Sequence, residues 1–60
     1  MNIQRKIERV ALDVYFDYQG GDCTATDYHS IEDKLSLAGL SDDYVDAVYH
    51  ELRNVFGLNV

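Results

Sequence analysis

Apolar residues recur at three- and four-residue spacing in the last third of the chain, with polar residues between them. At 100° per residue this spacing gathers six side chains on one helix face, namely Val45, Val48, Tyr49, Leu52, Val55 and Phe56. Ser41 is a suitable N-cap, and Gly57 can adopt the left-handed conformation that ends a helix, with Leu58 folding back onto Leu52. The pattern predicts a helix within residues 40–58, around which the rest of the chain is organised.

Two further helices are predicted before this one. Asn2 can cap a first helix that runs to about Tyr18, with a core-facing stripe of Ile3, Ile7, Val10, Ala11, Val14 and Tyr18. The Gly20–Gly21 pair and the polar residues after it predict a loop. A shorter helix then begins near Asp27 or Ser30, where Ser30 and Asp33 resemble a capping box, and it ends at Ala38 before Gly39.

These elements predict an all-α fold, a small three-helix domain with a tight helical hairpin formed by the second and third helices. The short joint at Gly39 makes those two helices neighbours, either antiparallel or at a steep angle, with the first helix packed across both. Residues 1–60 are expected to form a single acidic helical domain. Burial is expected for Ile7, Val10, Val14, Ile31, Leu35, Val48, Leu52 and Phe56.

The first helix has a second apolar feature. Leu12 and Phe16, one turn apart, point nearly opposite the core-facing stripe, and Tyr15 lies between the two faces. These residues either close over the following loop, or are simply exposed, or form a contact surface for another protein chain. The contact surface is the hypothesis that bears on function, because a chain of 60 residues buries only a marginal core.

Charge narrows the classes of partner. The chain has a formal net charge of −6, which argues against direct binding of DNA or RNA through phosphate contacts. Residues 1–9 nevertheless carry +2, from Arg5, Lys6 and Arg9 against Glu8, and the remaining residues carry −8. The single cysteine, Cys23, cannot form an internal disulfide and is typical of a reducing compartment, so we expect a cytoplasmic location. No apolar run is long enough to predict a membrane span.

No residue combination predicts an enzyme, a cofactor or a metal site. Asp46 and His50 lie one helical turn apart, but no second histidine follows at chelating spacing. Cys23 lies beside Asp22, whose charge would raise a thiol pKa rather than activate the thiol. Catalysis also needs a concave pocket, for which so short a chain leaves little room. We therefore expect a protein without catalytic activity.

The second half of the chain contains Gly39 and Leu40, then Asp42 onward to Leu52, and closes with Phe56, Gly57, Leu58 and Val60. This arrangement resembles the second helix of acyl carrier proteins, with their Gly-x-Asp-Ser-Leu opening and Phe-Gly-Ile-x-Ile close. The resemblance implies a degenerate acyl-carrier-like domain carrying phosphopantetheine. Aligned on Phe56, however, Asp42 stands where the modified serine should be and Ser41 lies one place early.

Two functional hypotheses follow. The first is a small non-catalytic protein-binding module of the adaptor or inhibitor type, self-associating or docking on a larger protein through Leu12, Tyr15 and Phe16. The second is an acidic mimic of nucleic acid that inhibits a nucleic-acid-binding protein, with Asp42, Asp43 and Asp46 imitating phosphates. A solvated acidic surface that only confers solubility is the alternative to the second hypothesis.

Overall fold

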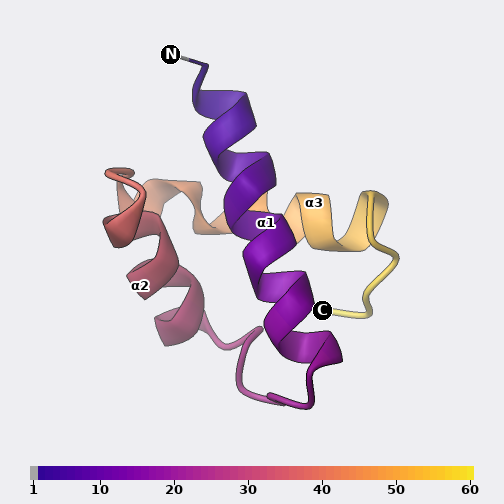
Figure 1. The fold of residues 1–60 in the computed structure, drawn as a ribbon. Helices are drawn as coiled ribbons and strands as arrows, with labels where there is room; N and C mark the ends of the chain where they lie inside the picture. Colours follow the sequence, from indigo (N-terminus) through magenta and orange to yellow (C-terminus); the bar gives the residue numbers. More distant parts are fainter. Residues whose placement is uncertain (1) are drawn as a thin grey trace.

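The computed structural model describes residues 2–60, and this part of the chain is helical, with no strand. Helix α1 spans Ile3–Gln19, α2 spans Tyr28–Leu37 and α3 spans Val45–Asn54. A short 3-10 turn, η1, covers Asp42–Tyr44 directly before α3. The three α-helices pack against one another (Figure 1), which confirms the predicted all-α, three-helix fold.

Local capping residues start two of the elements as predicted. The Asn2 side chain accepts a hydrogen bond of 2.9 Å from the backbone N–H of Gln4, and α1 begins at the next residue. Ser41 Oγ accepts one of 3.1 Å from the N–H of Asp43. The turn that Ser41 caps is 3-10 rather than α-helical, so α3 proper begins at Val45.

The start of α2 confirms the predicted start near Asp27 and not the alternative capping box at Ser30. Asp27 is the N-cap through its extended backbone alone, without a side-chain cap hydrogen bond. The Ser30 hydroxyl instead donates 2.9 Å to the carbonyl oxygen of Thr24, which ties the first turn of α2 to the preceding loop. At the other end Gly39 has a φ of +77°, and the N–H of Leu40 donates to the Leu35 carbonyl. This closure is a Schellman motif, and it ends α2 at Leu37, one residue earlier than predicted.

The C-terminal helix is shorter than the apolar pattern indicated. Helix α3 ends at Asn54, and Gly57 has a φ of +69°. The N–H of Leu58 donates 2.9 Å to the carbonyl oxygen of Leu52, so the chain folds back onto the residue predicted for it. The hydrogen bond spans six residues, one more than a Schellman closure, because the chain loosens after Asn54 before it turns.

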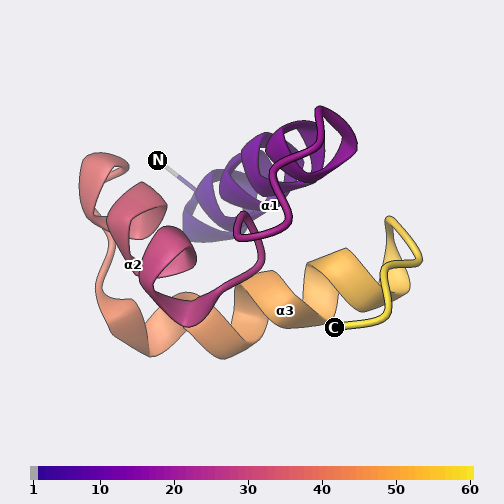
Figure 2. The ribbon, with the colours of Figure 1, turned by 90° about the horizontal axis from the view of Figure 1, so that it is seen from below.

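The helices form two layers. Helix α1 crosses in front of α3 in Figure 1, and α2 lies beside α1 on the left. Figure 2 shows the same arrangement from below, with α2 and α3 meeting at a steep angle after the connection at residues 38–41. One long side of α1 therefore faces the other two helices, and the opposite side faces outward.

One contiguous apolar core holds the layers together. It consists of Ile7, Val10, Ala11, Val14, Ala25, Ile31, Leu35, Val45, Val48 and Leu52, each at most 4% exposed. Seven of the eight residues expected to be buried are in this set, and the expectation for Phe56 is wrong, because its ring is only partly buried. Ile3 and Tyr18 are exposed as well, since they lie where α1 extends past its neighbours at either end.

Candidate protein-interaction surface

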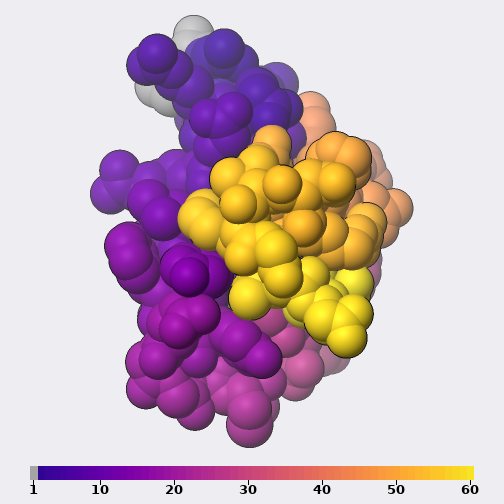
Figure 3. All heavy atoms as spheres, turned by 90° about the vertical axis from the view of Figure 1, so that its right-hand side faces the viewer, coloured from indigo at the N-terminus to yellow at the C-terminus, as the bar shows by residue number. Residues whose placement is uncertain are grey.

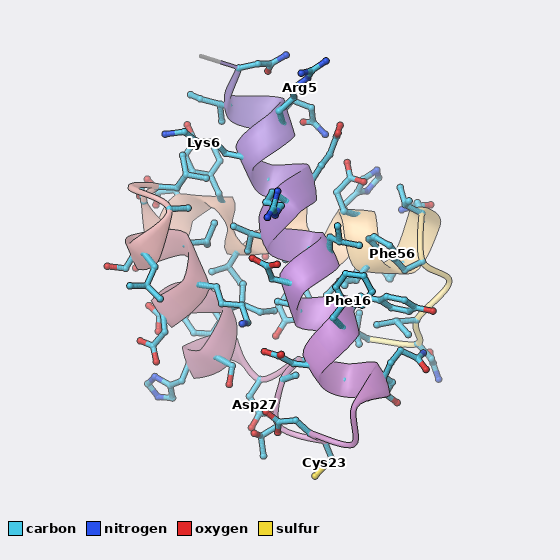
Figure 4. The ribbon with its side chains drawn as sticks, viewed as in Figure 1. Arg5, Lys6, Phe16, Cys23, Asp27 and Phe56 are labelled. Atoms are coloured by element: carbon cyan, nitrogen blue, oxygen red, sulfur yellow. The ribbon has the colours of Figure 1, made fainter. Side chains whose placement is uncertain are left out.

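Three aromatic rings form a row across the junction of α1 and the segment after α3. The rings of Tyr15 and Phe56 stack, with centroids 4.6 Å apart and an interplanar angle of 19°. Phe16 continues the row, its ring centroid 6.3 Å from that of Tyr15. Figure 4 shows Phe16 and Phe56 on the same side of the molecule, one from α1 and one from the segment after α3.

The aromatic row borders a groove between α1 and α3. The groove has a volume of about 500 Å³ and is lined by Glu8 and Leu12 of α1 and by Glu51, Val55 and Phe56. Phe16 is 61% exposed and Val55 is 66% exposed, while Leu12, Tyr15 and Phe56 are partly buried. Figure 3 shows the C-terminal residues, in yellow, packed beside α1 along this junction. We call Leu12, Tyr15, Phe16, Val55 and Phe56 the aromatic patch.

The sequence pattern predicts three of these five residues, Leu12, Tyr15 and Phe16. It places Val55 and Phe56 on the core-facing stripe of the last helix, which is wrong for Val55, at 66% exposure, whereas Phe56 packs against the core but is only partly buried. Val55 is the C-cap of α3 and keeps the α-helical conformation, with its N–H donating to the Glu51 carbonyl oxygen, and Phe56 beyond it stacks on Tyr15. The sequence shows that a helix ends near Gly57, but it does not show at which residue before this glycine the α-helix stops.

The second predicted set, Asp42, Asp43 and Asp46, lies near the other end of α3. These three acids and Val45 line a hollow beside Tyr28, the first residue of α2. All three acids are exposed, and none forms an ion pair within residues 2–60. Desolvation raises the pKa of Tyr28, and the charges of Glu32, Asp42, Asp46 and Asp43 raise it further. Since α3 is about 15 Å long, this acidic surface and the aromatic patch form two separate sites.

Basic residues gather on a third surface. A groove between α1 and α2 is lined by Lys6, Arg9, Val10, Asp13, Lys34, Leu37 and Ala38. Its charges are partly satisfied, because Lys34 Nζ lies 2.7 Å from Asp17 Oδ2 and Lys6 Nζ donates to the carbonyl oxygen of Ala38. Leu37 at its edge is 90% exposed, which the sequence pattern did not indicate.

The remaining reactive side chains make local structural contacts. Asp22 Oδ1 accepts hydrogen bonds from Thr24 Oγ1 at 2.7 Å and from the Thr24 N–H at 3.0 Å, and these bonds lower the pKa of Asp22. His29 Nδ1 lies 3.5 Å from Glu32, and His50 contacts Asn54. Cys23 is a free, exposed thiol in the loop (Figure 4). Across residues 2–60, no group of three or more His, Cys, Asp or Glu side chains could hold a metal ion.

Among the helices in residues 2–60, none is long and apolar enough to cross a membrane. Comparisons of this chain with protein-family models, with curated proteins and with solved structures found no match.

Proposed function

We propose that this chain is a small non-catalytic protein-binding module of the adaptor or inhibitor type, which binds through the aromatic patch. The observation that carries the proposal is the exposure of Phe16 and Val55, the sequence neighbours of the stacked pair Tyr15 and Phe56. Apolar side chains scattered singly over a surface are ordinary, but a contiguous group beside a groove is typical of an interaction site.

The patch has the composition of an interface core. Tyrosine and phenylalanine are enriched at interfaces, where rigid rings supply contact area at a small cost in conformational entropy. Stacking on Phe56 fixes the ring of Tyr15 before any partner arrives, so less freedom is lost on binding. Charged side chains, Glu8 and Glu51, lie along the same groove and supply a polar rim.

Self-association is the form of the proposal that is simplest to test. Sedimentation equilibrium at micromolar concentrations is compared for the parent chain, Phe16→Ser and Leu37→Ser. Both substitutions replace an exposed apolar residue, at 61% and 90% exposure, so neither removes a core contact. Burying a Phe side chain contributes about 1.5–3 kcal/mol, so Phe16→Ser should raise the dissociation constant by at least about tenfold.

The Leu37→Ser variant is the matched control, since Leu37 lies in the α1–α2 groove, away from the patch. An equal rise in the dissociation constant with both substitutions would mean that the chains associate through non-specific hydrophobic contacts. A parent chain that stays monomeric up to millimolar concentration would exclude self-association and leave only docking on a different protein.

A second candidate function rests on the acidic surface. Asp42, Asp43 and Asp46 are exposed without a cationic partner in residues 2–60, which supports an acidic mimic that occupies a nucleic-acid-binding protein. The neutralised triple variant Asp42→Asn, Asp43→Asn and Asp46→Asn tests it. Pulldown from cell lysate should recover a basic nucleic-acid-binding protein with the parent chain, release it as salt rises, and fail with this variant.

The control for that experiment removes the same number of charges elsewhere, at Asp13, Asp27 and Asp33, all of them exposed. Equal loss of the captured protein with both triple variants would indicate a general effect of net charge and would contradict a dedicated mimic. In either function the exposed thiol of Cys23 suits a reducing compartment such as the cytoplasm.

A further inference from the structure

The outward side of α1 carries a regular seam along the whole helix. Residues Arg5, Arg9, Leu12, Phe16 and Gln19 follow one another at alternating spacings of four and three, which places them on one narrow stripe. All are exposed except Leu12, which is partly buried. Leu12 lines the groove beside Glu51, Val55 and Phe56, whereas the other four residues of the stripe are exposed. Such spacing is the pattern by which one helix packs lengthwise against another.

Charge favours a second copy of this chain as the occupant. Two chains of net charge −6 repel each other, and in a two-fold contact each surface meets its own copy, so a surface whose charges nearly cancel is favoured over the acidic or the basic one. Around the seam Arg5 and Arg9 carry +2, and Glu8, Asp13 and, across the groove, Glu51 carry −3, which leaves only −1. The acidic surface at Asp42, Asp43 and Asp46 belongs to the opposite layer, on η1 and α3. Contact between two outward sides of α1 therefore keeps most of the negative charge apart.

Building on the proposed function, we infer that the aromatic patch is occupied by α1 of a second copy, antiparallel, with the two-fold axis passing beside Leu12. Leu12 is near the middle of Ile3–Gln19, so this register gives the two helices almost complete overlap. It sets each Arg5 opposite the partner's Gln19 and each Phe16 beside the partner's Glu8 and the partner's Arg9.

The antiparallel direction also satisfies the charged groups. A two-fold axis keeps the same flank of each helix together, so the partner's Arg9 comes between Asp13 and Phe16. In one chain Arg9 Nε lies 3.9 Å from Asp13, a long and exposed pair that leaves the guanidinium free to re-aim. A guanidinium over an exposed ring gains a cation–π contact. A parallel pair would instead set each Arg5 and Arg9 against its own copy.

Disulfide cross-linking tests the register. In a Cys23→Ser background, which removes the free thiol, single cysteines replace Leu12, Arg5 or Gln19, and Leu37→Cys is the control. Helices packed 8–10 Å apart bring facing Cα atoms within the roughly 7 Å that a disulfide allows. Under mild oxidation Leu12→Cys should form covalent dimer at least about tenfold faster than Leu37→Cys. Neither Arg5→Cys alone nor Gln19→Cys alone should form a covalent dimer, whereas a mixture of the two variants should form a disulfide-linked heterodimer.

The outcomes separate this inference from the proposed function. Self-cross-linking of Arg5→Cys would show a parallel pair and overturn the register. Dimers that weaken on Phe16→Ser but do not cross-link at position 12 faster than at position 37 would overturn the α1 pairing and leave the proposed function standing. A parent chain that is monomeric at every concentration would overturn the pairing, and the proposed function would then rest on a different partner.

Discussion

Two Leu→Ala substitutions, one in the apolar core and one at the surface, test how tightly the core is packed. Leu52 is 0% exposed at the centre of the apolar core, whereas Leu37 is 90% exposed at the end of α2. Leu52→Ala removes buried methyl and methylene groups and leaves a cavity, at a cost of about 2–5 kcal/mol. Leu37→Ala removes the same atoms from water contact, so the free energy of unfolding should change by less than about 0.5 kcal/mol.

The expected loss from Leu52→Ala is large compared with the total free energy of unfolding. A chain of 60 residues has a free energy of unfolding of roughly 3–9 kcal/mol, so Leu52→Ala should remove about a fifth of it or more. Urea unfolding followed by far-UV circular dichroism measures the effect. With an m-value of about 1 kcal/mol per molar, the midpoint should fall by about 2 M or more. Protein concentration is held constant, because self-association would add to the apparent stability.

A milder variant covers the case in which Leu52→Ala does not fold. Ile31 is also 0% exposed, and Ile31→Val deletes a single methylene at a cost of about 0.5–1.5 kcal/mol. If neither core substitution destabilised the chain more than Leu37→Ala does, the packing of α1 against α2 and α3 described above would be refuted.

Two further substitutions test the ends of the elements. Gly39→Ala should cost about 1 kcal/mol in urea unfolding, because φ is +77° and a Cβ there meets no other atom, so the loss comes from backbone strain alone. Tyr49→Phe removes the 2.8 Å hydrogen bond to the Thr26 carbonyl and should cost about 1 kcal/mol near neutral pH. Burial raises the pKa of Tyr49, as do Asp27 and Asp46, so this contribution is complete below the ordinary pKa of 10.0 and is lost as pH rises through the raised value. The parent chain should therefore lose its stability advantage over Tyr49→Phe in alkaline unfolding experiments.

The parts of the fold that the sequence predicted correctly depend on local rules. Asn2 and Ser41 cap because a short polar side chain reaches the N–H two residues ahead, whatever the rest of the chain does. Gly39 and Gly57 adopt positive φ for a similarly local reason. The seven correctly predicted core residues follow from helical periodicity, which needs only the existence of the helices.

The predictions that are wrong concern residues whose conformation or burial depends on a contact outside their own helix. Ser30 was one of two predicted starts for the second helix, and its hydroxyl instead donates to the carbonyl oxygen of Thr24, which the loop conformation brings within 2.9 Å. Ala25 lies in that loop and is 1% exposed, although no periodicity marks it as a core residue. Phe56 stacks on the ring of Tyr15, 41 positions away, and is only partly buried against the core. Spacing along one element contains no information about such partners.

Phe16 and Val55 are not adequately explained as apolar residues left over from a small core. Leftover residues would be dispersed in proportion to surface, as Ile3, Tyr28 and Leu37 are, at three different helix ends. Phe16 and Val55 are instead the sequence neighbours of one stacked pair, Tyr15 and Phe56. Both members of that pair also pack against the core. The same side of the chain lacks the acidic excess that covers the opposite layer. Exposed rings, a groove and near-neutral charge coincide at one place, and this is the combination that the proposed contact with another protein chain requires.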